Sequence, residues 1–453
     1  MDRLEKFTAI SNIPGDILAD HLIDLNALEV QLGQPERWIK LYIIFTPLLW
    51  LTGALLPASL LLLLWLLLRI PARKYLTDWV VLSWWMVSAA QIVSLYFNWV
   101  YFGEGMGFLL RQSLSFTTTG WFVMGAALAV GKYSRLDHKE LIRAACITGL
   151  YFIIFTIISI PLYLTLADRF KYIAVPFGLL LPEDMSLTKF YFTIHFYMFD
   201  DLYNVMLPRL VFFYPWPLCL SFAGIGFLFM SFQEESKWWK YVGITGALIG
   251  IAGSMGRMGI LALVGCILVY LWARLSTQAK WLLVPVLSVL LIVPLLSGWG
   301  ERFVSSKLNE VEASRQGSTD ARKLAYEMTW QAILKSPVVG YGWVGENISE
   351  EIPIPLGSHS TIFGLLYTGG VVTFGIFCLA AALTLATLLK QLTTMGNIRC
   401  LSALCIFLAL LMFAVTEGIN YFFISTLIIL FWIGAALSTT PDQDNERRLI
   451  LLV

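Results

Sequence analysis

Charged residues are scarce in this sequence of 453 residues, and their scarcity argues against an ordinary soluble fold. Only 13% of the residues are Asp, Glu, Lys or Arg, whereas 58% are hydrophobic. Soluble globular chains carry about 25% charged residues. The formal net charge is +1, so the balance of charge indicates neither nucleic acid nor an acidic partner. The composition is therefore that of a membrane protein.

Paired cysteines and a secretion signal are also missing. The six cysteines form no CxxC pair, so neither a zinc site nor a disulfide framework is indicated, and we expect no metal ligands. Residues 1–36 contain no continuous apolar run, so no cleavable signal peptide is expected there. Apolar residues at near-helical spacing in this segment predict an amphipathic helix, which either lies on the membrane surface or packs on the rest of the protein.

Long apolar blocks are abundant instead. A bilayer core about 30 Å thick needs roughly 20 apolar residues in a helix. Residues 37–453 therefore predict a single all-α polytopic transmembrane domain. Eleven or twelve spans are expected, because the first block contains Pro47 and Pro57 and forms either one tilted helix or a hairpin of two. The expected spans cover residues 38–69, 79–102, 107–131, 143–166, 209–231, 240–255, 258–273, 281–298, 361–389, 400–416 and 420–437.

Lysine and arginine predict the orientation of these spans, since short basic loops face the cytoplasm. Two long polar segments, residues 167–208 and 299–358, then lie outside the cytoplasm. The second is predicted to be partly helical, from Ala321 to Leu334, and Pro337 ends that helix. The basic residues of the alternate short loops are Arg69, Arg73, Lys74, Lys132, Arg135, Lys139, Arg143, Lys237, Lys240, Arg274, Lys280, Lys390 and Arg399.

The candidate site residues are the polar side chains at the predicted outer face. No GxxxxGK[ST], HExxH or GxSxG motif is present, so a membrane-borne substrate is expected. Arg257, in SMGRMG, either marks a phosphate site or snorkels to the interface. Arg322 either binds the same group or lies on a solvated helix face. His359, in GSHST, is either a base near neutral pH or an interfacial capping residue.

The order of these residues resembles the O-antigen ligase and polysaccharide polymerase superfamily. The family pattern is an arginine, a tryptophan, PxxGxG, a loop, and then a histidine that opens a transmembrane helix with a later glycine motif. Two positions depart from it: Ser360 replaces the usual asparagine, and Met255-Gly256 separates Ser254 from the arginine. The matching residues are Arg257, Arg322, Trp330, Pro337, Gly340, Gly342, His359, Gly369 and Gly370.

The resemblance implies a metal-independent, inverting glycosyltransferase that needs no cofactor. Its donor is implied to be a glycan on undecaprenyl diphosphate and its acceptor a sugar, at the periplasmic or exterior face of a bacterial inner membrane. Arg257 and Arg322 are then expected to bind the diphosphate, and His359 to take the acceptor proton. Arg209 and Glu417 fit weaker family patterns, and Tyr341 is a candidate for stacking on a sugar ring.

Three readings of the function remain open from the sequence. A polymerase of O-antigen, capsule or exopolysaccharide is preferred, because the N-terminal half lacks any pattern typical of ligases. An O-antigen ligase that transfers the glycan to lipid A-core is the alternative within the superfamily. A lipid or polysaccharide transporter is the alternative from another class, and Arg111 in the third predicted span is the one feature that favours it.

Overall fold

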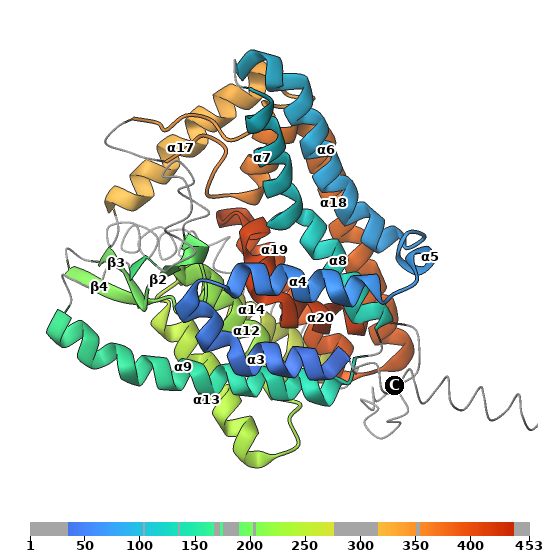
Figure 1. Cartoon of the computed structure of the whole chain (residues 1–453), viewed down its shortest axis with the longest axis vertical. Coiled ribbons are helices and arrows are strands. Elements are labelled where there is room, and N and C mark those ends of the chain that lie inside the picture. Colours follow the sequence, from blue (N-terminus) through green and yellow to red (C-terminus); the bar gives the residue numbers. More distant parts are fainter. Residues whose placement is uncertain are drawn as a thin grey trace, which may run out of the picture.

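Helices dominate the computed structural model, which describes residues 35–102, 105–134, 136–166, 173–174, 190–202, 205–275, 316–349 and 354–438 (Figure 1). The predicted all-α polytopic membrane architecture is confirmed. The α-helices are α3 (Pro35–Thr52), α4 (Leu55–Leu68), α5 (Ala72–Tyr75), α6 (Trp79–Phe102), α7 (Met106–Thr118), α8 (Trp121–Tyr133), α9 (His138–Leu166), α12 (Pro217–Ser231), α13 (Lys237–Gly253), α14 (Arg257–Arg274), α17 (Gln316–Lys335), α18 (Thr361–Met395), α19 (Ile398–Thr416) and α20 (Leu427–Ala436). The shorter elements are β1 (Ile173–Ala174), η1 (Phe190–Phe192), β2 (Thr193–Ile194), β3 (Tyr197–Leu202), β4 (Val205–Leu210) and η2 (Ile419–Thr426).

Within the described ranges, seven helical stretches are long and apolar enough to cross a membrane. The block predicted as one or two helices over 38–69 forms two, α3 and α4, which separate at Gly53 and pack on each other. The expected span 281–298, the amphipathic segment up to residue 34 and the first part of the loop 299–358 lie outside the described residues. The seven stretches are Trp79–Trp99, Met106–Tyr133, His138–Thr165, Arg257–Arg274, Thr361–Thr394, Ile398–Thr416 and Ile419–Ala436.

One predicted span begins later than expected. The span predicted over 209–231 starts at Pro217, and its first residues instead belong to β4, which pairs antiparallel with β3. A short apolar run cannot be assigned to helix or strand by periodicity alone, and proline is favoured in the first turn of a helix. The hairpin positions Arg209 on a strand opposite Met198.

The interior of the bundle is built around α20. Every residue of α20 is buried, and the helix packs against α8 and α19. Trp84 and Trp121 stack beside it with ring centroids 5.6 Å apart, and Phe377 meets Trp121 edge to face at 5.1 Å. A helix that is apolar on all sides is expected at the centre of such a bundle. This core fixes the positions of the helix ends that carry the polar residues.

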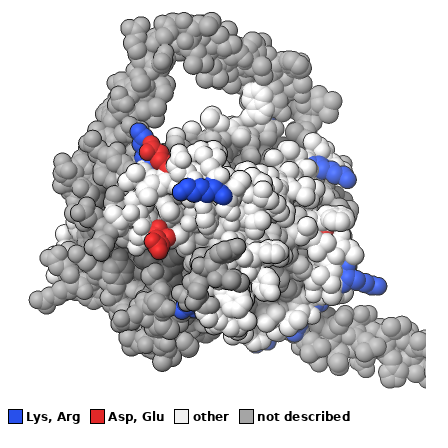
Figure 2. Space-filling view, turned by 90° about the horizontal axis from the view of Figure 1, so that it is seen from above, with Lys and Arg blue, Asp and Glu red and all other residues white. Residues whose placement is uncertain are grey.

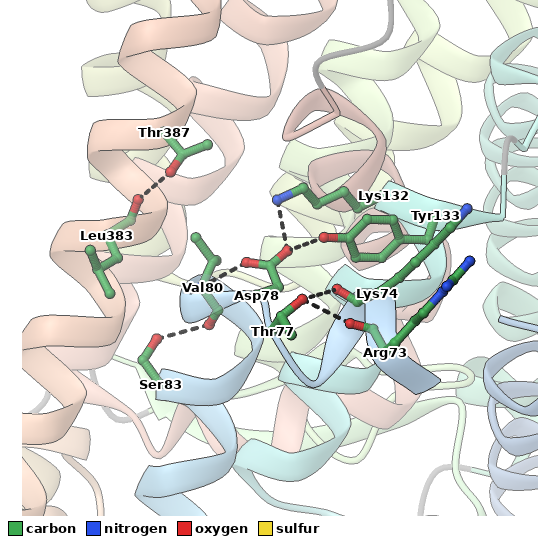
Figure 3. A network of polar contacts seen from close by, with 10 residues as sticks. All are labelled: Arg73, Lys74, Thr77, Asp78, Val80, Ser83, Lys132, Tyr133, Leu383 and Thr387. Carbon is green, nitrogen blue, oxygen red and sulfur yellow. Dashed lines mark hydrogen bonds and ion pairs between the residues drawn. The ribbon is translucent and has the colours of Figure 1, made fainter. Parts of the chain in front are cut away.

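The basic loops gather at one end of the bundle, where buried carboxylates pair with them. Lys132 Nζ lies 2.7 Å from Oδ2 of Asp78, and the Tyr133 hydroxyl donates to the same oxygen at 2.7 Å (Figure 3). The guanidinium of Arg143 donates to both carboxylate oxygens of Glu234, at 2.9 and 3.0 Å. Two-point pairs of this kind fix geometry as well as charge. The first pair joins the residue before α6 to the end of α8, and the second joins α9 to the loop before α13.

The described parts of the two predicted outer segments lie at the other end. A helix of 15 residues, such as α12, is about 22 Å long, so its start at Pro217 lies far from Glu234 beyond its end. By the same reasoning, Glu417 at the end of α19 lies far from Ile398 at the start of that helix. In Figure 1 the loop with α5 lies towards the right, whereas β3, β4 and α17 lie towards the left. The basic loops and the described parts of the two long polar segments therefore lie at opposite ends of the bundle.

The described surface is poor in charge, as a lipid-facing surface must be. Figure 2 shows one face of the molecule, on which the described residues are mostly uncharged. Large apolar side chains on the helices, such as Leu164 (75% exposed) and Leu68 (73% exposed), point away from the bundle. Lipid tails satisfy such side chains as well as a protein core does.

A break in α18 accommodates the loop that follows α17. Gly370 has φ 64° and ψ −169°, so the helix is interrupted there. The loop replaces the lost helical hydrogen bonds: Val371 N donates to Pro337 O at 2.8 Å, and Tyr341 N donates to Tyr367 O at 2.8 Å. Backbone groups in the hydrocarbon region must be satisfied in this way. The PxxGxG segment is therefore the partner of the interrupted helix.

Replacing Gly370 with alanine is expected to destabilise the protein by about 1–3 kcal/mol or more, because its φ and ψ are open essentially to glycine alone. A Cβ there would also lie 2.2 Å from Val338 O. Gly375→Ala, on the same helix, is the matched control, since a Cβ at Gly375 meets nothing within 4 Å. Thermal melting in detergent compares the two variants, and equal melting temperatures would contradict the expectation.

Candidate functional site

Arg322 lies on α17 and pairs with Glu417, 95 residues further along the chain. Its Nη1 is 3.3 Å from Oε1 of Glu417. The Arg322 side chain is 34% exposed, whereas that of Glu417 is 6% exposed. The predicted helix Ala321–Leu334 is confirmed within α17, and it presents the guanidinium to the turn between α19 and η2. The pair therefore joins α17 to the turn between α19 and η2.

Glu417 ends α19 and is held by the start of α18. Its backbone is extended, with φ −141° and ψ 154°. Its carbonyl accepts hydrogen bonds from the backbone N of Thr361 at 2.9 Å and from the Thr361 hydroxyl at 2.7 Å. The same hydroxyl oxygen accepts from Ile419 N at 3.0 Å. These bonds fix the turn of Glu417 against the first residue of α18.

His359 precedes α18 by two residues and has a left-handed backbone, with φ 59°. Its carbonyl accepts a hydrogen bond from the Tyr326 hydroxyl at 3.0 Å. The Tyr326 ring in turn stacks on Phe363, with ring centroids 4.9 Å apart and planes 11° apart. Ser360 caps α18 by accepting from Phe363 N at 3.4 Å. The imidazole is therefore carried by a backbone that α17 and α18 fix from both sides.

The charges of these residues act on one another. Burial, and then the positive charge of Arg322, lower the pKa of His359 to about 4. Burial raises the pKa of Glu417 to about 7, against the opposing effect of Arg322 and Arg209. At neutral pH the imidazole is therefore neutral, and the carboxyl is close to its own titration point. Shifted carboxyl and imidazole groups of this kind are typical of functional sites.

Arg209 connects the hairpin to this cluster. Its Nε donates to the carbonyl of Ser254 at 2.8 Å, in the turn between α13 and α14. The positive charge of Arg209 also acts on the Glu417 carboxyl. The predicted additional residues Arg209 and Glu417 are thus brought to the same end as Arg322.

Arg257 is the first residue of α14 and is exposed. The turn before it contains Met255 with φ 50°, and Gly256 N donates to Ser254 Oγ at 3.3 Å. The start of α14 lies against the end of α19, since a Cβ on Gly259 would lie 3.8 Å from Phe413. Phe413 is one turn before Glu417. Arg257 therefore lies on the turn next to the cluster, at the same end of the bundle.

Tyr341 has a different environment. Its ring stacks on Tyr367, with centroids 4.7 Å apart, and its hydroxyl donates to Ala332 O at 2.9 Å. Both contacts belong to the loop that fills the break in α18. Tyr341 therefore packs beside Tyr367, which lies eight residues after His359. Among the described residues it makes no hydrogen bond or ring contact with Arg322, His359 or Glu417.

Two residues of this region were not predicted. Tyr326 positions the His359 backbone, and Thr361 binds Glu417. Tyr326 lies four residues after Arg322, and residues spaced by four share a helix face, so the spacing could have identified it. Nothing in the local sequence of Thr361 indicates its partner 56 residues away.

No group of three His, Cys, Asp or Glu side chains that could hold a metal ion occurs among the residues that the structure describes. The polar groups at this end are guanidinium, carboxyl, imidazole and hydroxyl. Such a set can bind an anion and accept a proton. It offers a phosphate both counter-charge and hydrogen-bond donors.

Comparisons with known proteins agree with the sequence motifs. A family model described as O-Antigen ligase matches residues 242–378, a range that contains Arg257, Arg322 and His359. No curated protein matches the chain. Residues 242–378 are therefore similar to the O-antigen ligase family, and the chain is a multi-pass bacterial membrane protein with similarity to that glycan-processing superfamily.

Proposed function

We propose that this protein transfers a glycan from undecaprenyl diphosphate to an acceptor sugar at the outer face of the inner membrane, as a polysaccharide polymerase. The observation that carries the proposal is the cluster of Arg322, Glu417 and His359. It combines a guanidinium, its buried counter-charge and a neutral imidazole at the end of the bundle opposite the basic loops. The family match supports the same class of reaction.

The donor diphosphate suits the charge of the cluster. As a diester it carries two negative charges, and it gains a third when the glycosidic bond to phosphate breaks. Arg322 and Arg257 bind it, and they stabilise the charge that grows on the leaving group. Such preorganised charge is worth more at a partly buried site than in water. The prenyl tail remains in the bilayer beside α14 and α18.

His359 acts on the acceptor. The acceptor hydroxyl oxygen forms a bond to the anomeric carbon while the bond from that carbon to the phosphate oxygen breaks. The hydroxyl proton passes to the imidazole of His359, and undecaprenyl diphosphate leaves with the bonding electrons. Direct displacement inverts the anomeric carbon. A general base of this kind contributes about 100- to 10,000-fold to the rate.

The identity of the acceptor is tested by incubating the purified protein in lipid nanodiscs with undecaprenyl-diphosphate-linked repeat units. Products that form a ladder of increasing glycan length support the polymerase. Transfer of one glycan to added lipid A-core, with no ladder, assigns the acceptor of an O-antigen ligase instead. Absence of any new glycosidic bond, together with movement of the lipid across the bilayer, would reject glycosyl transfer in favour of a transporter.

Transfer is expected to survive removal of divalent cations. Because guanidinium groups supply the counter-charge in this proposal, 5–10-fold excess EDTA over the protein should leave the initial rate unchanged to within about twofold. The measurement compares initial rates with EDTA, with EDTA plus excess Mg²⁺, and with Mg²⁺ alone. Loss of activity in EDTA that Mg²⁺ or Mn²⁺ restores would contradict the expectation.

A further inference from the structure

Glu417 is an unfavourable neighbour for a diphosphate, yet it occupies the guanidinium that is proposed to bind one. The contact is a single one, Nη1 to Oε1, at 3.3 Å. Charge-assisted hydrogen bonds are usually 2.7–2.9 Å long and are strongest as two-point pairs. The pair is therefore weaker than the two-point contact of Arg143 with Glu234 at the other end of the protein.

Hydrogen bonds hold the Glu417 backbone in place. Thr361 holds its carbonyl with two hydrogen bonds, and Ile419 N binds the Thr361 hydroxyl. The carboxyl therefore stays near Arg322 when an anion arrives. The charged and titratable groups that act on it are Arg322 and Tyr326 from α17 and Arg209 from β4, while His359 lies within the influence of Arg322.

When a lipid diphosphate binds Arg322, the Glu417 carboxyl loses its nearest counter-charge. An ionised carboxylate would then be buried, with its nearest counter-charge engaged and two phosphate charges close by. Burying an uncompensated charge is costly, and such groups become neutral instead. Burial already raises the pKa of Glu417 to about 7 in the donor-free protein, so little further change is needed for the carboxyl to hold a proton at neutral pH.

We propose that Glu417 is a positioning residue that pairs with Arg322 while the site is empty and accepts one proton from water when a lipid diphosphate takes that guanidinium. This inference rests on the proposed function. It assigns Glu417 the role of a competitor for Arg322, rather than that of a ligand for the diphosphate. Donor binding is then coupled to protonation of the Glu417 carboxyl.

The test is calorimetry of the purified protein with farnesyl-diphosphoryl-N-acetylglucosamine, whose phosphates do not titrate near neutral pH. Titrations at pH 8 in buffers of different ionisation enthalpy count the protons taken up. About one proton is expected for the wild type, and Kd is expected to rise about tenfold per pH unit above neutrality. Glu417→Gln should abolish the proton uptake and make Kd independent of pH.

Glu327→Gln is the matched control, because Glu327 is exposed on the same helix as Arg322 and should behave like the wild type. Proton uptake that persists in Glu417→Gln belongs to another group, His359 first of all, and would overturn the inference. Wild-type binding with no proton uptake overturns it too, even if the Glu417 variant fails to fold, while leaving the proposed function standing. Failure of the wild type to bind the lipid diphosphate at all overturns the proposed function itself.

Discussion

Replacing Arg322 with alanine is expected to lower kcat/KM for the lipid-linked donor by about 100- to 1000-fold, the loss typical when one preorganised charge donor is removed. Arg322→Lys should recover only part of the rate, because an ammonium keeps the charge but lacks the planar fork that matches phosphate oxygens. Initial rates with purified protein in nanodiscs provide the measurement. Lys323→Ala, the next residue and an exposed one, is the control that should retain the wild-type rate.

Loss of Arg322 also leaves the Glu417 carboxyl without its 3.3 Å partner, so a folding defect must be separated from a catalytic one. The double variant Arg322→Ala/Glu417→Gln removes the unpaired carboxyl together with the guanidinium. We expect it to regain thermal stability in detergent without regaining activity. Turnover by Arg322→Ala within about threefold of the wild type would remove Arg322 from the site, since one missing hydrogen bond to a charged group costs more than that.

The transmembrane helices could be predicted from the sequence wherever long apolar runs end at polar residues. The same argument identified α17, because its apolar face repeats at helical spacing and Pro337 follows its end. It also explains why Glu417 and His359 lie at one end, since each flanks a predicted span. The argument did not work at 209–216, where the predicted span begins with the end of β4, which pairs with β3, and with a turn before Pro217.

Contacts between residues that lie far apart in the sequence could not be predicted. The pairing of Arg322 with Glu417 spans 95 residues, and it arises only after α19 packs beside α18. Gly370 was part of the recognised motif, but its role as the break that receives the 337–342 loop depends on α6 as well, since the Ser94 hydroxyl lies within hydrogen-bond distance of the Thr368 carbonyl. Such contacts depend on packing, which local sequence patterns do not encode.

The contacts of Tyr341 could not be predicted from the sequence either. An aromatic side chain in this loop is a candidate for stacking on a sugar ring, and an interfacial aromatic belt explains such a residue equally well. In the structure its ring and its hydroxyl are engaged with Tyr367 and Ala332. A role for Tyr341 in sugar binding therefore stays a prediction. It requires the sugar to replace Tyr367 and Ala332 as the partners of the Tyr341 side chain.

Replacing His359 with asparagine is expected to lower kcat by about 100- to 10,000-fold while leaving donor binding nearly unchanged, since a general base acts on the acceptor proton. Asparagine is the appropriate substitute because the backbone is left-handed here, with φ 59°, and Asn tolerates that region well. His359→Ala loses this tolerance and adds strain. Single-turnover transfer with preformed donor complex separates the chemical step from binding, and a wild-type rate in His359→Asn would exclude His359 as the base.

The pH dependence of kcat/KM gives an independent check, because it reports the groups of the free enzyme. Burial and the charge of Arg322 disfavour the protonated imidazole, so the pKa of His359 is lowered to about 4 and the base remains neutral above that pH. The acid limb should therefore fall near pH 4, instead of near the ordinary value of about 6.5. Replacing Arg322 with a neutral residue removes one of the two causes, so the acid limb should move to higher pH. An acid limb that stays near 6.5 in both proteins would mean that a different, solvated group accepts the proton.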